Sequence, residues 1–519
     1  MIPQPHSEIH AMKALDAPQY LYSAADTRLI DQTAIHDLGL AGIELMERAG
    51  SGALAALREY WPHARTLSVV CGAGNNGGDA YVVARRALEF GLDVRAYPAT
   101  PPESLKGDAR LAYERYRDQG GEILEFIPED FEATEILVDG LLGTGLDRDV
   151  TGHYAEIIEA INRYRERGEQ HAANQRAVAA LDIPSGLHAD TGSRLGVAVK
   201  ADLTVSFVAL KRGLFTGDGP ELAGAVVLDD LSIPCAARQK VLPSARLWTP
   251  PFPPLPRRPL SGHKGLYGHV LVVGGDHGFS GAVRLAAEAA ARVGAGLVSV
   301  ATRADQAMIL NLTRPELMVH GVENPASLDA LLDRATVVAI GPGLGQSSWG
   351  LALLERVLTT ELPLIVDADA LNLLGETPCV RHNWVLTPHP GEAGRLLGMT
   401  SQDIQRDRFT AIGALQSRYG GTIVLKGSGT LILTADGIAD ICGAGNPGMA
   451  SGGMGDVLTG VIAGLIAQNI HPAEAARFGV CLHAAAGDLA ARDGERGLLA
   501  SDLLGKLRGL INGPAADDR

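Results

Sequence analysis

Apolar, strand-like segments alternate with helix-like segments along this chain. In the first half the strand-like segments cover residues 67–70, 94–97, 135–139, 177–182 and 202–207, and helix-like segments such as 80–90 lie between them. In the second half they cover 269–275, 297–301, 337–341 and 364–369, and 422–427 with 430–433 forms a predicted hairpin. Strands that alternate with helices predict a mostly parallel sheet covered on both faces. The fold class is therefore α/β, with two tandem three-layer α/β/α domains.

A proline-rich segment separates the two series of strands. Residues 243–259 contain seven prolines in seventeen residues, and proline lacks the backbone N–H that helices and sheets use. Such a segment favours a stiff, extended connector without regular secondary structure. We therefore expect an N-terminal extension at 1–20, a first domain at 21–242, a linker at 243–259 and a second domain at 260–519. At 23–26 the sequence predicts a capping box that opens the first helix.

The composition restricts the partners of the chain. Its 519 residues carry a formal net charge of -15, which disfavours binding to nucleic acid or to an anionic membrane surface. The five cysteines form no CxxC pair, so neither a disulfide framework nor a structural zinc site is expected. We identify no signal peptide, and no apolar run reaches the roughly 20 residues that span a bilayer. The sequence predicts a soluble, cytoplasmic protein.

A glycine-rich turn near the end of the chain predicts phosphate chemistry. The run Gly452-Gly453-Met454-Gly455-Asp456 precedes an apolar, helix-like stretch at 457–465. Backbone N–H groups at such a helix start bind anions, and the helix dipole adds partial positive charge. A carboxylate beside a phosphate is unfavourable unless it has a function, and deprotonation of an attacking hydroxyl is such a function. Asp456 is therefore a candidate base for phosphoryl transfer to or from an alcohol.

Four further segments of the second half accompany this turn, and one of them, Ser280-Gly281-Ala282, opens a helix after Gly274-Gly275. Residues 341–345 are glycine-rich and would let a ligand approach the backbone, and residues 387–392 present His389 between two prolines. Residues 426–430 offer a lysine and backbone donors to a phosphate. The last segment lacks the G-x-x-x-x-G-K-[ST] pattern, which disfavours a P-loop NTPase.

The first half has a glycine-rich loop of its own. Residues 72–79 follow a strand, open a helix and satisfy G-x-G-x-x-G, the dinucleotide fingerprint. The aspartate that ends this loop stands where a pyrophosphate would bind, so an ordinary oxidoreductase is not expected. Asp139, Asp182 and Ser185 follow other strands, and the carboxyl ends of parallel strands meet at one edge of a sheet. Together with Asn76 they would supply oxygen ligands for an alkali or alkaline-earth cation and one acid or base.

Four motifs of the first half, at 46–50, 75–79, 139–145 and 182–186, resemble those of the NAD(P)H-hydrate epimerases. The second half resembles the ADP-dependent NAD(P)H-hydrate dehydratases, whose fold is ribokinase-like. From about residue 20 to 515 the chain is thus similar to a bifunctional nicotinamide-nucleotide repair family. The resemblance implies a Rossmann-like first domain that interconverts the R and S hydrates of NADH and NADPH (NADHX and NADPHX). It implies a second domain that dehydrates the S form with ADP, giving NAD(P)H, AMP and phosphate.

The resemblance also implies the site residues of the first domain. Asp182 would be the catalytic acid or base, and Asn76, Asp139 and Ser185 would hold a potassium ion. Lys211 also lies in a family-like segment, without an assigned role. Substrate contacts are expected from Asn75, Asn76, Gly77, Gly78, Asp79, Gly143, Thr144, Gly145, Leu146, Asp147, Arg148, Asp149, Tyr154 and Asp182.

For the second domain the resemblance implies a hydrate site and a nucleotide site. Asp456 would be the catalytic base. Magnesium is expected to neutralise the phosphates, with Glu392 as the suggested ligand. The hydrate would be contacted by Ala282, Gly343, His389 and Asp456, and ADP by Lys426, Gly427, Ser428, Gly429, Thr430 and Gly455.

Two alternatives remain at this stage. The second domain could be an ATP-dependent vitamin or sugar kinase, because that fold family shares the glycine-rich turn before Asp456. The first domain could be a non-catalytic binding module. The expected partners in the main interpretation are the small-molecule substrates NADHX, NADPHX and ADP, with further copies of the chain in a homo-oligomer.

Overall fold

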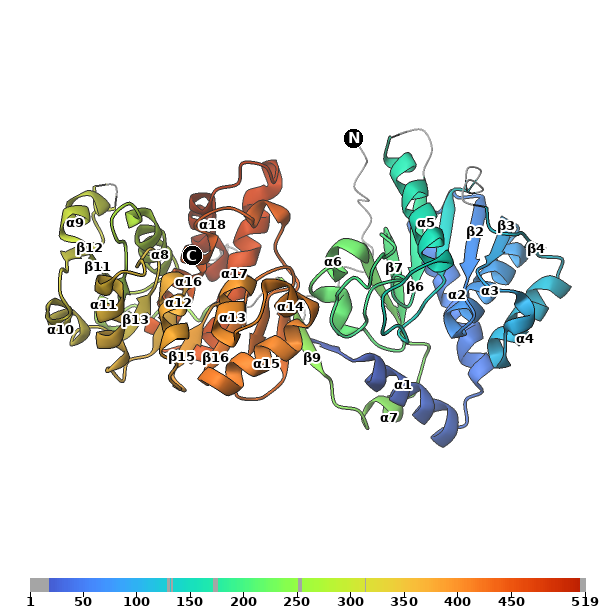
Figure 1. Cartoon of the computed structure of the whole chain (residues 1–519), viewed down its shortest axis with the longest axis horizontal. Coiled ribbons are helices and arrows are strands. Elements are labelled where there is room, and N and C mark those ends of the chain that lie inside the picture. The colour runs from blue at the N-terminus through green and yellow to red at the C-terminus, as the bar shows by residue number, and fades with distance from the viewer. Residues whose placement is uncertain are drawn as a thin grey trace. The chain divides into compact units, whose positions relative to one another are not determined.

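The structure is a computed structural model that describes residues 18–127, 131, 134–170, 176–250, 254–312 and 314–513. The chain forms two compact units, Tyr20–Ala245 and the part from Arg246 onward, each built around one β-sheet with flanking helices (Figure 1). Residues 1–17 of the predicted extension lie outside the described residues, and its last residues belong to a short strand, β1 (Gln19–Leu21).

The first unit contains a seven-stranded sheet in which all neighbouring strands are parallel. Their order across the sheet is β4-β3-β2-β5-β6-β7-β8, which is Rossmann-like as predicted. The strand order reverses between β2 and β5, and open α/β sheets bind ligands outside the carboxyl ends of the strands at such a point. The five predicted strands are confirmed, whereas the edge strands β4 and β8 were not predicted. The strands are β2 (Thr66–Cys71), β3 (Asp93–Pro98), β4 (Glu122–Ile123), β5 (Ile136–Gly140), β6 (Ala177–Leu181), β7 (Leu203–Phe207) and β8 (Ala225–Asp229).

Helices cover both faces of this sheet. Val69 and Cys71 of β2 pack into an apolar cluster with α2 and α3, whereas Val70 between them packs into a second cluster with α5. Successive side chains of a strand point to opposite faces, so both faces are buried. The predicted capping box is confirmed at the start of α1, where Ser23 and Asp26 exchange hydrogen bonds. The helices are α1 (Ala24–Gln32), α2 (Gly42–Tyr60), α3 (Asn75–Glu89), α4 (Gly107–Asp118), α5 (His153–Gln170), α6 (Gly219–Leu222) and α7 (Cys235–Arg238).

The second unit is built on an eleven-stranded mixed sheet. The order is β1-β9-β18-β17-β16-β15-β14-β13-β10-β11-β12, and the strands from β12 to β16 in this order pair in parallel. This ribokinase-like sheet has a switch point between β10 and β13, and β16 with β17 forms the predicted hairpin. The short strands β12, β15 and β18 were not predicted. The strands are β10 (His269–Val273), β11 (Leu297–Thr302), β12 (Met318–Gly321), β13 (Val337–Ile340), β14 (Leu364–Val366), β15 (Trp384–Leu386), β16 (Thr422–Leu425), β17 (Leu431–Leu433) and β18 (Ala439–Cys442).

The core of the second unit surrounds α16 (Met454–Ala467). All residues of this helix from Val457 to Ala467 are buried, as expected for a helix that is apolar on all sides. Its buried body fixes the position of its N-terminus, which carries the predicted phosphate-binding turn. No helix in the described ranges is long and apolar enough to cross a membrane. The other helices are α8 (Ser280–Arg292), α9 (Ala304–Leu310), α10 (Asp329–Leu332), α11 (Ser348–Leu358), α12 (Ala368–Glu376), α13 (Pro390–Leu397), α14 (Ser401–Arg406), α15 (Arg408–Tyr419), α17 (Pro472–Ala490) and α18 (Ala500–Asn512).

The proline-rich segment contains a strand, which the sequence analysis did not expect. Strand β9 (Ala245–Trp248) lies between Pro243 and Pro250, in a stretch without proline where every residue keeps its backbone N–H. The expectation that 243–259 lacks regular secondary structure is therefore wrong for these four residues.

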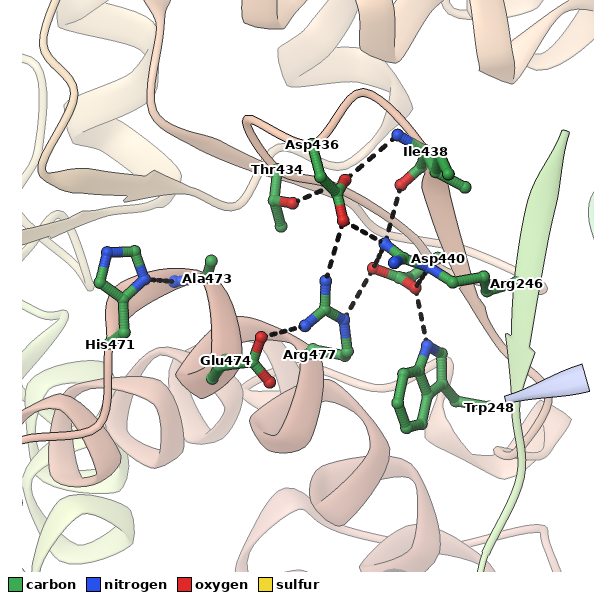
Figure 2. A network of polar contacts seen from close by, with 10 residues as sticks. All are labelled: Arg246, Trp248, Thr434, Asp436, Ile438, Asp440, His471, Ala473, Glu474 and Arg477. Carbon is green, nitrogen blue, oxygen red and sulfur yellow. Dashed lines mark hydrogen bonds and ion pairs between the residues drawn. The ribbon is translucent and has the colours of Figure 1, made fainter. Parts of the chain in front are cut away.

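Side chains of β9 join a buried polar network of the second unit (Figure 2). Asp440 of β18 is fully buried, and its Oδ1 accepts hydrogen bonds from Arg246 Nε at 2.6 Å and Trp248 Nε1 at 2.7 Å. Its Oδ2 accepts from Arg477 Nε of α17 at 2.7 Å. One carboxylate thus connects β9, β18 and α17.

Candidate active sites

A cavity of about 690 Å³ lies at the switch point of the first unit. The loops after β2 and β5, at 73–76 and 141–148, form much of its wall, and α1 and α2 contribute further side chains. The cavity therefore forms where the strand order predicts a ligand site. Of the predicted substrate contacts, it is lined by Asn75, Asn76, Asp79, Gly143, Thr144, Gly145, Leu146, Asp147, Arg148, Tyr154 and Asp182.

Three predicted contacts do not line this cavity: Gly77, Gly78 and Asp149. The two glycines serve the packing of α3. A Cβ atom at Gly77 would lie 2.0 Å from the carbonyl oxygen of Gly72, and one at Gly78 would lie 2.6 Å from the Met46 side chain. The glycines of the fingerprint therefore bring the start of α3 close to β2 and α2, and this sets the direction of its N-terminus.

Asp182 forms an ion pair with a fully buried lysine. Lys211 Nζ donates to Asp182 Oδ1 and to the carbonyl oxygen of Phe207 at 2.7 Å. The same Asp182 oxygen accepts from the backbone N–H of Phe207 at 3.1 Å. Asp182 has a φ of +65°, a conformation that costs energy for residues other than glycine and is concentrated at functional sites. The structure therefore assigns a partner to Lys211 and aims the Asp182 carboxylate into the cavity.

Two more carboxyl groups face the same cavity. Burial raises the pKa of Asp79 well above its usual range, and the charges of Asp182 and Asp31 add to this effect while Lys211 opposes it. Burial likewise raises the pKa of Asp31, on α1, to about 6, with Lys211 lowering it and Asp182 raising it. The cavity thus contains one lysine-paired carboxylate and one carboxyl group, Asp79, that favours the protonated form.

The three predicted potassium ligands lie together beside the cavity. Asp139 and Ser185 are fully buried, and Ser185 Oγ donates to Asp139 Oδ1 at 2.6 Å while its backbone N–H donates to Oδ2 at 2.8 Å. Asn76 Nδ2 donates to the carbonyl oxygen of Leu142 at 3.0 Å. Asn76 Oδ1 is buried and has no hydrogen-bond partner among the described residues, which is unfavourable unless a cation or donor occupies the space before it. These oxygen donors fit an alkali ion.

In the second unit, the predicted segments converge at the carboxyl ends of the parallel strands. The turn before α16 depends on Gly453, which has a φ of +89°. Lys426, at the end of β16, reaches this turn, because its Nζ lies 3.2 Å from the position that a Cβ atom of Gly455 would occupy. Ala282 and Gly343 also meet, since a Cβ atom at Gly343 would lie 3.3 Å from that of Ala282.

Asp456 lies at the start of α16 among other charged groups. Burial and the carboxylates of Asp367, Asp369 and Glu392 together raise its pKa to about 7, although Lys426 acts to lower it. A pKa near the working pH lets one group accept and release a proton. The structure therefore gives Asp456 the environment of a general base.

His389 has a capping role that the sequence analysis did not foresee. Its Nδ1 accepts hydrogen bonds from the backbone N–H groups of Gly391 and Glu392 at the start of α13, at 2.9 and 3.3 Å. The imidazole is half exposed, and its Nε2 lies 3.4 Å from Glu392 Oε1. A ligand contact of His389 would therefore use the exposed part of the ring.

Glu392 does not fit the suggested role of a magnesium ligand. It is buried, its Oε2 accepts from the backbone N–H of His389 at 2.7 Å, and the same oxygen lies 3.7 Å from Lys426 Nζ. Within the described ranges there is no group of three or more His, Cys, Asp or Glu side chains that could hold a metal ion.

Comparison with known proteins matches both halves of the chain to known families. Residues 42–213 match the family described as YjeF-related protein N-terminus, and residues 270–508 match the family NAD(P)H-hydrate dehydratase. The chain is 50% identical to the bifunctional NAD(P)H-hydrate repair enzyme Nnr of Coxiella burnetii, over 95% of this chain and 99% of that protein. The chain belongs to the bifunctional NAD(P)H-hydrate repair enzymes. It is also 43% identical to the Escherichia coli enzyme of that name, over 98% of this chain and 97% of that protein.

One solved structure is similar to about half of this chain. It is the ADP/ATP-dependent NAD(P)H-hydrate dehydratase of Bacillus subtilis, co-crystallised with ATP and Mg²⁺, with 32% identity and a TM-score of 0.45. The match covers 49% of this chain and 93% of that protein. The dehydratase match over 270–508 favours the dehydratase prediction over the kinase alternative.

Sequence reasoning missed several residues of the repair enzyme's two sites. Asp31 lines the cavity from α1, in which the sequence analysis identified a capping box but no site residue. The sequence analysis placed Asp367 and Asp369 at the end of a strand. In the structure they follow β14, and their charges raise the pKa of Asp456. Thr459, in the apolar body of α16, donates to Asp367 Oδ2 at 2.8 Å. The available signal was the position of Asp367 and Asp369 at a strand end, which is where the other site residues lie.

Proposed function

We propose that the first unit epimerises NAD(P)H hydrates at C6 and that the second unit dehydrates the S form with ADP. The first proposal depends chiefly on the ion pair of Lys211 with Asp182 in the cavity at the switch point. The second depends on Asp456, whose pKa is raised to about 7 at the N-terminus of α16. The relatives named above are bifunctional NAD(P)H-hydrate repair enzymes, and the two site geometries support one activity in each unit.

In the epimerase, the C6 hydroxyl is on a carbon beside the ring nitrogen. The nitrogen lone pair can expel this hydroxyl once it takes up a proton, which leaves an iminium and one water molecule. Water then adds to the other face of C6 and loses a proton. One carboxyl group in each role contributes about 10²–10⁴-fold.

Asp182 and Asp79 fit the two proton-transfer roles. Asp182 accepts a hydrogen bond from the Lys211 ammonium through Oδ1, and it lines the cavity. We therefore assign Asp182 as the base that deprotonates the incoming water. Asp79, whose pKa is raised by burial and by neighbouring carboxylates, is the proton donor to the departing hydroxyl. One turnover moves one proton from Asp79 to Asp182, and exchange with solvent restores the starting state.

Asn76, Asp139 and Ser185 would hold potassium beside this cavity. The ion, when bound there, would supply positive charge beside the cavity. The chain's own contribution is the prepared set of oxygens, including the unpartnered Oδ1 of Asn76.

In the dehydratase, Asp456 would remove the proton of the C6 hydroxyl. The hydroxyl oxygen would attack the β-phosphoryl group of ADP, and AMP would leave. The backbone N–H groups at the start of α16 would bind the transferred group, with Lys426 adjacent to Gly455. The phosphate ester at C6 then leaves with its bonding electrons while C5 loses a proton, which forms the C5–C6 double bond of NAD(P)H.

The nucleotide loop 426–430 follows β16 directly and would contact ADP. Magnesium, when bound with the nucleotide, would neutralise phosphate charge. A homo-oligomer remains a prediction, which light scattering of the purified chain would test.

The test of both activities uses a mixture of R and S hydrates. Near-ultraviolet absorbance of the dihydronicotinamide ring is followed after addition of ADP, Mg²⁺ and K⁺. The wild-type chain is expected to restore nearly all the signal. Asp182→Asn is expected to repair the S form and then stop, and Asp456→Asn is expected to repair neither. Full recovery by Asp182→Asn would contradict the epimerase assignment, and recovery with ATP but not ADP would contradict the choice of co-substrate.

A further inference from the structure

Asp367 is a buried carboxylate in the second unit that no step above uses. It follows β14, is only 1% exposed, and precedes Ala368, which has a φ of +48°. Such backbone strain in a residue other than glycine persists only where the surrounding structure enforces it, and it is concentrated at functional sites. The strained turn directs the Asp367 side chain toward α16 and the end of β16.

Both oxygens of this carboxylate are used. Oδ1 accepts from Lys426 Nζ at 2.7 Å, and Oδ2 accepts from Thr459 Oγ1 at 2.8 Å. Burial alone would raise the pKa of Asp367, but Lys426 and the Thr459 hydroxyl lower it below its usual value. Burial alone would lower the pKa of Lys426, yet Asp367 and Glu392 raise it. The pair therefore stays charged.

The position of the ammonium group follows from these contacts. Lys426 Nζ lies 3.2 Å from the place of a Cβ atom on Gly455, and Asp367 Oδ2 lies 3.6 Å from it. The lysine is thus fixed against the first turn of α16, where free backbone N–H groups bind an anion. Among the described residues, the other carboxylate that forms an ion pair with this ammonium is Glu392 of α13, at 3.7 Å.

We propose that Asp367 is a positioning residue of the dehydratase reaction, which holds the Lys426 ammonium at the N-terminus of α16 where the transferred phosphoryl group is bound. This inference depends on the proposed dehydratase function. Without Asp367 the ammonium would turn toward Glu392 and leave the phosphoryl site. Preorganised positive charge contributes about 10²–10³-fold to such steps when one donor is removed.

Asp367 also acts on the base through its charge. The groups that face Asp456 are the carboxylates of Asp367, Asp369 and Glu392 and the ammonium of Lys426. Loss of the Asp367 charge removes one of the causes that raise the pKa of Asp456. The acid side of the kcat–pH profile should then move to lower pH.

The test compares Asp367→Asn with the wild type on the S hydrate. Asparagine keeps the size of the side chain and can still accept from Thr459. We expect kcat to fall by about 10²-fold, KM for ADP to rise, KM for the hydrate to stay nearly constant and the acid limb to move to lower pH. An unchanged kcat and an unchanged pH profile, with only a lower melting temperature, would show a structural role and overturn the proposal.

A double-mutant cycle with Lys426→Met separates an effect of Asp367 through the lysine from an independent effect. If Asp367 acts through the lysine, Asp367→Asn should add little loss of kcat to Lys426→Met, whereas independent effects would multiply and contradict the proposal. Asp333→Asn, an exposed residue of the same unit, is the matched control. If the wild-type chain does not consume ADP, the proposed dehydratase function itself is refuted. If the wild-type chain consumes ADP but the variants do not behave as expected, only the role proposed for Asp367 is refuted.

Discussion

Lys211 Nζ, which is fully buried, donates to Oδ1 of Asp182 and thereby joins the strained turn after β6 to the segment after β7. Burying an ammonium group is costly unless a carboxylate and further acceptors compensate it. Phe207 supplies such an acceptor through its carbonyl oxygen at 2.7 Å. The pair thus keeps a carboxylate oriented at the cavity of the first unit.

The first prediction concerns this lysine. Lys211→Met removes the ammonium and leaves Asp182 without its partner, so epimerisation should fall by about 10²–10⁴-fold. Dehydration of pure S hydrate should be unchanged, because it takes place in the second unit. Coupled recovery from R hydrate measures the first rate, and direct recovery from S hydrate measures the second. Asp118→Asn, on the exposed end of α4, is the control. Equal losses of both activities would indicate misfolding instead.

The second prediction concerns the proton donor. Asp79→Asn keeps the shape of the side chain but cannot donate a carboxyl proton, so the epimerase kcat should fall by about 10²-fold or more. In the wild type, the rate should decline as pH rises through the raised pKa of Asp79, since the donor form is then lost. The ratio of R to S hydrate in samples quenched at several pH values would measure this decline of the rate. A variant with the wild-type rate and the wild-type alkaline limb would exclude Asp79 as the donor.

The third prediction concerns potassium. Ser185→Ala removes an oxygen that also donates to Asp139 Oδ1, so the K⁺ concentration for half-maximal epimerisation should rise by about 10–100-fold. Rates measured against KCl at constant ionic strength would show the shift. The dehydratase rate of the same protein provides the internal control. If KCl has no effect on wild-type epimerisation, Asn76, Asp139 and Ser185 do not form a potassium site.

The fourth prediction is a pH dependence of dehydration. Asp456 must be a carboxylate to accept a proton, and burial with three carboxylates raises its pKa to about 7. The kcat for S hydrate should therefore rise as pH increases through about 7 and fall below it. Rates at saturating ADP across pH would define this limb. A flat profile from mildly acid to mildly alkaline pH would argue against Asp456 as the base.

Residues that follow predicted strands in sequence were the ones that sequence reasoning could place. Asp139 and Asp182 end or follow apolar segments, and the parallel topology then brings them to one edge of the sheet. Asp456 was placed by the glycines before it. In each case a local pattern identified both the residue and its position in the fold.

Residues whose role depends on distant partners could not be placed in this way. Asp367 is 59 residues from Lys426 and 92 from Thr459, and no local pattern connects them. Lys211 was noticed, but its partner lies on the turn after another strand. Strand β9 was not predicted because the proline content was counted over the whole segment. That segment contains a short stretch without proline, which pairs with the sheet.

The last prediction concerns the stability of the second unit. Asp440 is fully buried and accepts from Arg246, Trp248 and Arg477, so Asp440→Ala would leave two guanidinium groups without their central partner (Figure 2). Removing one member of a buried ion network costs about 3–5 kcal/mol of the free energy of unfolding. Denaturant unfolding followed by loss of dehydratase activity should therefore show a lower midpoint, whereas epimerase activity should be lost at the wild-type denaturant concentration. The control Asp333→Asn should leave both midpoints unchanged. If Asp440→Ala loses dehydratase activity at the same denaturant concentration as the wild type, β9 is held mainly by its backbone pairing.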